Sequence, residues 1–515
     1  MGIYGINQMQ VVHPYDVSGI SIDSAYDVNG NSVFENEPIL GQEYLGGYIE
    51  IQPDSWDGSN AVVGTIVPTN DITAWGFPMS LSSASKSSIK NDVLNGSTGI
   101  KFIRFPMGFA YRGYRNIDQK TGLAKNIGER WDGQNNDLHE WFSSIAATGG
   151  GLAPEYWSIP PHWLTGGAYS ASENQLNAGG TYPQSKPLKD IRIADPTQYA
   201  AQIDAFTDAV LDDMQYLERN VAPVVMFGLS NEPQYGTLLY GGCKWDAQTY
   251  NDVYSALIPK LKAEFPNILF HTASSDEANP FSGIASQFIA NNKANIWGYT
   301  HHSMRYASGE NGNGADEYYK SAGYASMVEG KENVFINEYE YFTPDNVGDD
   351  NFKCSNNMVH LIDEMVYGKA KVLHPIIHIC KPTGQSASST NTKGYCLFQV
   401  NMSDGSYAVN TWAYNSWKMF SDNLPIGARL VKNYFVDISG IGFMTVIKNN
   451  KLYVFVANCS SVAKTLTLGF FGGKTFQTKL YNMTNLGTVT GLSETITNLV
   501  VPANSGVCCI ENQVN

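Results

Sequence analysis

Two segments of the sequence place glutamates directly after apolar runs. Segment 227–233 (FGLSNEP) contains Glu232, and segment 333–341 (NVFINEYEY) contains Glu338 and Glu340, which lie on the same side of an extended chain because they are two residues apart. Hydrolysis of a glycosidic bond uses two carboxyl groups, one to protonate the leaving oxygen and one to attack or stabilise the anomeric centre. These residue types therefore fit glycoside cleavage, provided that the fold brings the two segments together.

Several apolar runs in the middle of the chain predict buried strands, at 100–107, 221–229, 268–272, 295–300 and 333–341. Amphipathic helices lie between them. The clearest has Asp195 as N-cap, Pro196 in its first turn and an apolar stripe from Tyr199 to Leu217, and another covers 247–265. This alternation predicts an α/β fold, which we expect to be a (β/α)8 TIM barrel over residues 46–424.

A barrel of this kind would bring the two glutamates into one site. Catalytic residues of such barrels lie at the C-terminal ends of the strands, and both Glu232 and Glu338 follow apolar strand segments. A glutamate after a strand is more often the first charge of a helix than a catalyst. The position of two such glutamates at strand ends of one barrel favours the catalytic interpretation.

The sequence pattern changes after Leu424. Short alternating runs with turn residues follow, as in 443–447, 452–457, 465–470, 476–481 and 500–510, and the first two read as a hairpin around Asn449 and Asn450. We expect an all-β sandwich over residues 425–515 that packs on the barrel, to which the N-terminal segment 1–45 contributes strands.

Charge and composition restrict the partners. With 33 Lys and Arg against 48 Asp and Glu, the formal charge of −15 opposes binding to nucleic acid or an anionic membrane. No apolar run is long enough to cross a bilayer and no signal peptide is visible, so we expect a soluble protein. The 7 cysteines lack metal-ligand spacing, so they are expected to be buried thiols, with no metal and no cofactor. The 30 tyrosines and 10 tryptophans suit stacking on sugar rings.

Four short segments of the sequence resemble one enzyme family. Segment 230–233 (SNEP) is similar to the acid/base strand of clan A glycosidases, and 157–164 (WSIPPHWL) resembles a tryptophan-containing segment of glycoside hydrolase family 30 within that clan. Segment 104–108 (RFPMG) resembles the family's arginine-containing strand, and 423–429 (NLPIGAR) its passage from barrel to sandwich. The resemblance covers most of residues 45–515, and it implies the barrel-and-sandwich fold with retaining glycosidase activity.

The resemblance also implies roles for individual residues. Glu232 corresponds to the acid/base, Asn231 to the contact with the sugar 2-hydroxyl, Arg104 to the support of the nucleophile, and Trp157 to the glycone pocket. Glu338 is the expected nucleophile, because the separation 338 − 232 = 106 leaves room for the strands between the fourth and the seventh. Glu340 is the rival, which would otherwise line a subsite.

Other aromatic and histidine side chains lie near the same strand ends. The candidate substrate contacts are Trp163, Tyr299, His301, His302 and Tyr341. A tyrosine in such a chain is as often a packed residue with its hydroxyl satisfied. The adjacent histidines also allow a metal interpretation, but two ligands without a third are weak evidence for it.

The sequence therefore predicts a retaining glycoside hydrolase that cleaves β-linked sugars of a polysaccharide, oligosaccharide or glycoconjugate by double displacement. The alternatives are another clan A retaining glycosidase with a different sugar, or an inactive barrel that serves as a carbohydrate-binding or virion surface protein. The expected partner is a carbohydrate. Oligomeric state and cellular location are not predicted.

Overall fold

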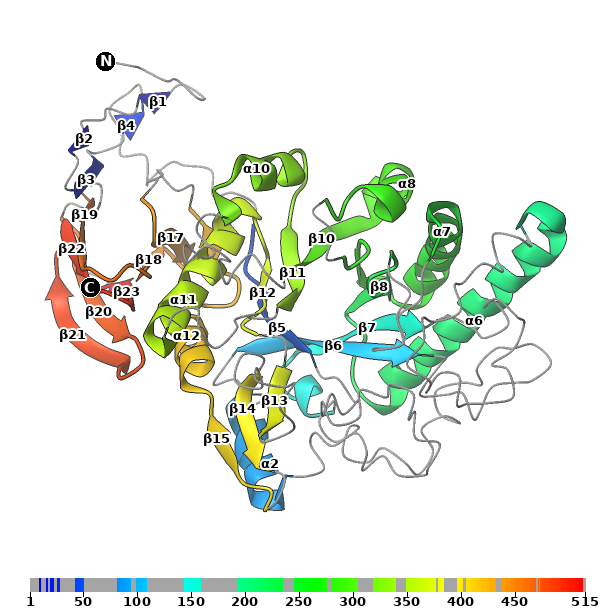
Figure 1. Ribbon diagram of the computed structural model, residues 1–515, viewed down its shortest axis with the longest axis horizontal. Helices are drawn as coiled ribbons and strands as arrows, with labels where there is room; N and C mark the ends of the chain where they lie inside the picture. Colours follow the sequence, from blue (N-terminus) through cyan, green and yellow to red (C-terminus); the bar gives the residue numbers. More distant parts are fainter. Residues whose placement is uncertain are drawn as a thin grey trace.

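The computed structural model describes most of the barrel and the sandwich (Figure 1). The described residues are 9–10, 15–16, 19–22, 26–27, 42–50, 81–93, 99–108, 143–158, 192–234, 245–275, 279–303, 318–339, 349–376, 378–383, 396–401, 404–431, 438–468, 471 and 473–512. The predicted α/β class, a (β/α)8 barrel with an attached β-sandwich, is confirmed. In the part of the chain that the structure describes, no helix is both long and apolar enough to span a membrane.

A parallel sheet forms the barrel. Its neighbouring strands are, in order, β11 (Val334–Tyr339), β10 (Ile296–Ser303), β9 (Leu269–His271), β8 (Met226–Ser230), β7 (Gly151–Ser158), β6 (Ile100–Gly108), β5 (Gly46–Glu50), β13 (His378–Thr383) and β14 (Cys396–Asn401). All these pairs are parallel, as crossover helices require. β12 (Val372–Leu373) also pairs with β5, and β15 (Tyr407–Val409) adds antiparallel to β14.

Helices follow most barrel strands. They are α2 (Ser83–Val93), α6 (Pro196–Asn220), α7 (Ala247–Glu264), α8 (Gly283–Asn292), α10 (Ala322–Val328), α11 (Asp350–Tyr367) and α12 (Thr411–Ser421). The side chain of Asp195 accepts from the N–H of Gln198, which confirms the predicted N-cap of α6. The predicted start of the next strand at Val221 is wrong, because Val221 is the C-cap of α6 and bonds back to Leu217; β8 begins at Met226.

Side chains fill the barrel interior in two kinds of layer. The lower layer is apolar and includes Tyr48, Phe102, Met226 and Phe335. Above it, toward the C-terminal strand ends, the inward positions become polar, because inward side chains recur every second residue along each strand. The interior is therefore a packed support beneath a polar centre rather than a channel.

Two sheets, one antiparallel and one mixed, form the sandwich. One has the order β16 (Arg429–Leu430), β17 (Ile441–Lys448), β18 (Lys451–Asn458), β23 (Ser505–Glu511), β20 (Phe476–Tyr481) and β21 (Leu486–Glu494). The predicted hairpin is β17–β18, and Asn449 and Asn450 take the left-handed conformation that its turn requires. The other sheet has the order β2 (Tyr15–Asp16), β3 (Gly19–Ile22), β19 (Lys464–Leu468) and β22 (Asn498–Val501), with β3 parallel to β19. A further short pair joins β1 (Met9–Gln10) and β4 (Tyr26–Asp27).

The barrel and the sandwich share one core. Helices α11 and α12 lie between the barrel strands and the sandwich, while α6, α7 and α8 lie on the far side of the barrel (Figure 1). Phe420 of α12 stacks on Phe455 of β18, with ring centroids 5.6 Å apart and an interplanar angle of 9°. Gly442 of β17 lets α11 approach, because a Cβ there would meet the backbone of Val359 at 3.1 Å.

Candidate active site

Three neighbouring strands each place one charged side chain inside the barrel. Glu50, Arg104 and Glu155 lie on β5, β6 and β7, each two residues after a member of the apolar layer, and all three are fully buried. Because inward positions recur every second residue along a strand, the three charged side chains point into the barrel and lie together. An isolated buried charge is costly, so these groups have to pair with one another.

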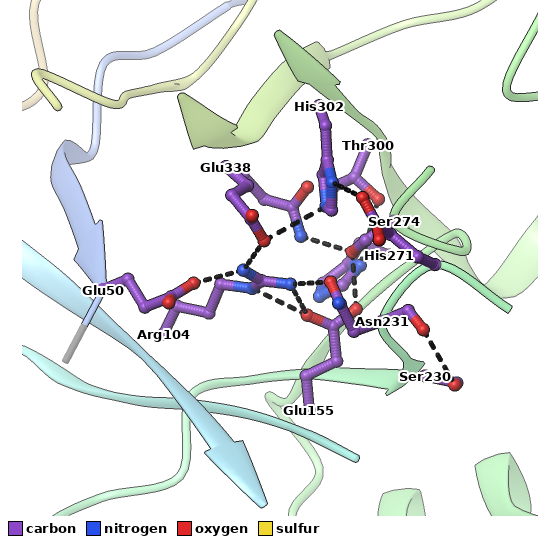
Figure 2. A network of polar contacts seen from close by, with 12 residues as sticks. Glu50, Arg104, Glu155, Ser230, Asn231, His271, Ser274, Thr300, His302 and Glu338 are labelled. Carbon is purple, nitrogen blue, oxygen red and sulfur yellow. Dashed lines mark hydrogen bonds and ion pairs between the residues drawn. The ribbon is translucent and has the colours of Figure 1, made fainter. Parts of the chain in front are cut away.

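The guanidinium of Arg104 is the centre of the cluster (Figure 2). It contacts the side chains of Glu50, Glu155, Asn231 and Glu338. Nε donates to Glu155 Oε2 at 2.7 Å, Nη2 donates to Asn231 Oδ1 at 2.5 Å, and Nη1 donates to Glu338 Oε2 at 2.5 Å and also to Glu50. Charge-assisted bonds of this kind fix orientation strongly. Arg104 therefore ties the ends of four barrel strands to one point.

Arg104 and the glutamates around it stabilise one another's charged forms. Burial acts to lower the pKa of Arg104, but Glu155, Glu50 and Glu338 outweigh it and raise that pKa well above its ordinary value. Burial acts to raise the pKa of Glu155, but Arg104 and a hydrogen bond from Ser274 outweigh it and lower the pKa. Both groups are thus charged at neutral pH.

A β-bulge turns two consecutive side chains of β11 into the barrel. The register with β10 shifts between His301 and His302, which leaves Asn337 as an extra residue before Glu338. In a regular strand these two would face opposite sides. Here Asn337 donates to Ser274 Oγ while Glu338 reaches the guanidinium, so both point inward.

Glu232 follows β8 in the left-handed backbone conformation, with φ at 38°, which few residues with a side chain adopt. Its N–H donates to the carbonyl of Ser274 at 2.8 Å, and the N–H of Asn231 donates to the carbonyl of Tyr156 at 3.1 Å. These bonds from neighbouring strand ends hold the turn. The side chains of Glu232 and Glu338 are 8 % and 9 % exposed, so each carboxylate keeps a small contact with solvent.

The ring of His302 lies between the two glutamates. Its Nδ1 is 3.0 Å from Glu232 Oε1, and its Nε2 is 3.6 Å from Glu338 Oε2. Burial acts to lower the pKa of His302, but the charges of Glu338 and Glu232 outweigh it and raise the pKa to about 9. The site therefore contains two carboxylates from separate strand ends, joined through one imidazolium.

The structure brings together five of the predicted residues, namely Arg104, Asn231, Glu232, His302 and Glu338. Two others lie elsewhere. Tyr299 packs on Phe281 and His301 lies among tyrosines of α10 and the segment before it, because side chains before the bulge alternate between interior and helices. Burial lowers the pKa of His301 to about 4, so this ring is neutral.

Four predicted contacts fall outside the described side chains. Trp163, Glu340 and Tyr341 lie outside the described residues, and of Trp157 only the backbone, in β7, is described.

Sequence reasoning missed several members of the centre, namely Glu50, Glu155, His271, Ser274 and Asn337. A signal for Glu50 and Glu155 was present, since each follows an inward apolar residue by two positions. His271 is accommodated because its neighbour in β8 is Gly228, where a Cβ would meet the ring at 2.1 Å. Such cross-strand size matching has no local sequence signature.

Solved structures share this arrangement of barrel and sandwich. A family 30 subfamily 8 xylanase from Clostridium acetobutylicum is 16 % identical, with a TM-score of 0.58, over 92 % of this chain and 98 % of that one. The catalytic domain of family 30 xylanase C from Talaromyces cellulolyticus is 12 % identical, with a TM-score of 0.62 and the same coverages, 92 % and 98 %. An endo-β1,6-glucanase is 13 % identical, with a TM-score of 0.57 over 92 % of each chain.

The chain has the fold of glycoside hydrolase family 30. No family model matches the sequence, and no curated protein matches it either. At identities of 12–16 % the likeness concerns the fold.

Proposed function

We propose that this protein is a retaining glycoside hydrolase of β-linked sugars, with Glu232 as acid/base and Glu338 as nucleophile. The observation that carries the proposal is that both glutamates, from the C-terminal ends of β8 and β11, contact opposite nitrogens of His302. Two carboxyl groups in one site, on a barrel with this fold, are the machinery of glycosidic bond cleavage.

The contacts of Glu338 suit a nucleophile. Arg104 donates to Oε2 at 2.5 Å and so fixes the orientation of the carboxyl group that attack requires. Because Oε2 is engaged, we assign Oε1 as the oxygen that forms the bond to the anomeric carbon. Glu50 and Glu155 pair with the same guanidinium, so the positive charge of Arg104 is divided among three glutamates and does not act on Glu338 alone.

Asn231 has the orientation that a sugar hydroxyl needs. Its Oδ1 accepts from Arg104 Nη2 at 2.5 Å, and this assigns the amide so that Nδ2 is the donor left for substrate. We assign Nδ2 to the 2-hydroxyl of the bound sugar. Hydrogen bonds to that hydroxyl strengthen in the transition state of retaining glycosidases.

The neighbours with this fold support a β-linked glycan as substrate. They are named as xylanases and as an endo-β1,6-glucanase. The formal charge of −15 also favours a neutral glycan over a polyanion.

Substitution of each glutamate tests the proposal on a panel of aryl β-glycosides. Glu338→Gln should abolish turnover, and Glu232→Gln should lower kcat by about 10²–10⁴-fold, with rescue by azide on an activated substrate. Glu332→Gln, whose side chain is 82 % exposed just before β11, is the matched control and should retain wild-type rates. Wild-type rates in both active-site variants would rule the assignment out.

The first-formed anomer, followed by NMR, separates the mechanisms. Retention of configuration is expected, since Glu338 attacks directly. Inversion would remove the nucleophile role and leave Glu338 as a base that activates water.

The same panel of aryl β-glycosides with Glu340→Gln decides between the two glutamates of segment 338–340. Loss of turnover in that variant together with activity of Glu338→Gln would transfer the role of nucleophile to Glu340.

A further inference from the structure

Among the histidines whose side chains the structure describes, His302 differs from the others in what its two nitrogens face. Nδ1 faces Glu232 at 3.0 Å and Nε2 faces Glu338 at 3.6 Å, and the side chain is fully buried. Its backbone N–H donates to the carbonyl of Ser275 at 2.9 Å, which fixes the strand on which the ring stands. The ring thus occupies a defined position between the two groups that carry the proposed reaction.

The position of the ring between two carboxylates favours its charged form. A neutral imidazole would turn a lone pair toward one of them, whereas an imidazolium donates to Glu232 at 3.0 Å and presents its second N–H to Glu338, whose Oε2 lies within ion-pair range of Nε2 at 3.6 Å but beyond hydrogen-bond distance. In the part of the chain that the structure describes, the charged and titratable groups around the ring are Glu232, Glu338, Arg104, Glu155, His271 and His301. Burial lowers the pKa of His271 and of His301, so the proton resides on His302.

We infer that His302 stores the proton that Glu232 delivers to the leaving group, and that the charge of Glu338 controls its release. This inference rests on the proposed function. In the resting enzyme the proton is on Nδ1 of His302, and Glu232 and Glu338 are both carboxylates. Transfer breaks the Nδ1–H bond and forms an O–H bond on Glu232, which leaves the ring neutral.

The glycosylation step explains the release. As Glu338 forms its bond to the anomeric carbon, its negative charge disappears, and with it the main attraction that holds the proton on His302. The proton moves to Glu232 and on to the glycosidic oxygen, while the bond from that oxygen to the anomeric carbon breaks. The nucleophile and the acid are therefore coupled through one ring.

The second half of the cycle restores the proton. Water gives a proton to Glu232 and its oxygen to the anomeric carbon, and the ester bond to Glu338 breaks. The carboxylate of Glu338 returns, and the proton moves from Glu232 to His302. One water is consumed for each bond cleaved, so atoms and charge balance over the turnover.

Two activity measurements test this role, with His302→Gln and His302→Asn as independent variants. The alkaline limb of the pH profile of kcat/KM should move to lower pH by roughly one unit or more, because Glu232 and the ring at position 302 no longer titrate as a pair. The loss of kcat should be larger for an aryl glycoside with a poor leaving group than for a dinitrophenyl glycoside, which needs no proton. His301→Gln, the adjacent buried histidine, is the matched control and should leave the limb in place.

A measurement without turnover separates this inference from the proposed function. In ¹⁵N-labelled protein, the imidazole signals that His302→Gln removes should stay doubly protonated up to a pH of about 9, and Glu338→Gln should shift their titration to lower pH. An unmoved alkaline limb, equal losses for both leaving groups, or a ring that is neutral at pH 7 would overturn the storage role even if the wild type is an active glycosidase. Absence of glycosidase activity with a charged ring would instead contradict the proposed function.

Discussion

At the scale of single residues, the centre of the barrel depends on a match of sizes as well as of charges. His271 is fully buried, its Nδ1 contacts the carbonyl of Thr272 at 2.8 Å and the hydroxyl of Thr300 at 3.2 Å, and its ring lies against Gly228. The absence of a side chain at position 228 is what allows an imidazole to stand beside Glu155. The polar centre thus depends on a glycine in the adjacent strand.

Gly228→Ala tests this match. The new Cβ would meet His271 Cε1 at 2.1 Å, so the ring or the strand has to move, and we expect a destabilisation of about 1–3 kcal/mol, measured by denaturant unfolding. Gly323→Ala in α10 is the control, because its Cβ would have its nearest neighbour at 3.8 Å, and it should be neutral or slightly stabilising. Equal stability of both variants would show that the ring has room to move.

The sequence could predict which residues meet at the strand ends, but not which way each one points. Glu232 and Asn231 follow an apolar strand, and Arg104 ends another, so their convergence follows from the barrel. His301 and His302 follow the predicted strand 295–300, and the structure extends that strand through both, so that His302 shares the inward face of β10 with Thr300 and His301 takes the opposite face. The bulge in β11 turns both Asn337 and Glu338 inward, and it arises from pairing between strands rather than from the residues of either one.

At the scale of elements, α11 holds β11 from outside the barrel. The N–H of Ile336 donates to Glu364 Oε1 at 2.8 Å, and the ring of Tyr339 stacks on His360 with centroids 4.0 Å apart. Ile336 and Tyr339 flank the two residues that the bulge turns inward. Helix α11 therefore fixes both ends of the segment that carries Glu338.

Burial raises the pKa of Glu364 well above its ordinary value, so this side chain is neutral in the folded protein. The unfolded chain ionises above a pH of about 4.3, so the contribution of Glu364 to stability is full below that pH and declines as the pH rises toward the folded pKa. Glu364→Gln keeps an acceptor for Ile336 and cannot ionise. Its Tm relative to the wild type should therefore rise between pH 5 and pH 8.

Glu364→Leu separates charge from hydrogen bonding. It leaves the buried N–H of Ile336 without its acceptor, which should cost about 1–3 kcal/mol at every pH. Parallel pH profiles for the wild type and Glu364→Gln would contradict a neutral Glu364. Neither this residue nor its role was predicted, because a glutamate within a helical pattern is normally solvent-exposed.

At the scale of the whole molecule, the barrel and part of the sandwich belong to one hydrophobic core. Met444, Phe455 and Cys508 of the sandwich join the same buried cluster as Trp417 and Phe420 of α12. A second cluster, which includes Phe476, lies within the sandwich alone. The amphipathic patterns predicted each part, but the shared core depends on which faces of α11 and α12 meet β17 and β18, and this cannot be read from either segment alone.

The shared core predicts cooperative unfolding, which two phenylalanines test. Phe455 stacks on Phe420 across the interface, whereas Phe476 lies in the core of the sandwich itself, and both are fully buried. Phe455→Ala and Phe476→Ala should each lower one common thermal transition, because truncating a large core side chain costs about 3–5 kcal/mol. Deletion of 425–515 should give an insoluble barrel, because it exposes the part of the shared core that the sandwich covers. If the sandwich folded independently, Phe476→Ala would split off an early transition while the barrel kept its own midpoint. A single lowered transition in both variants would mean that the sandwich stabilises the strands that carry the two glutamates.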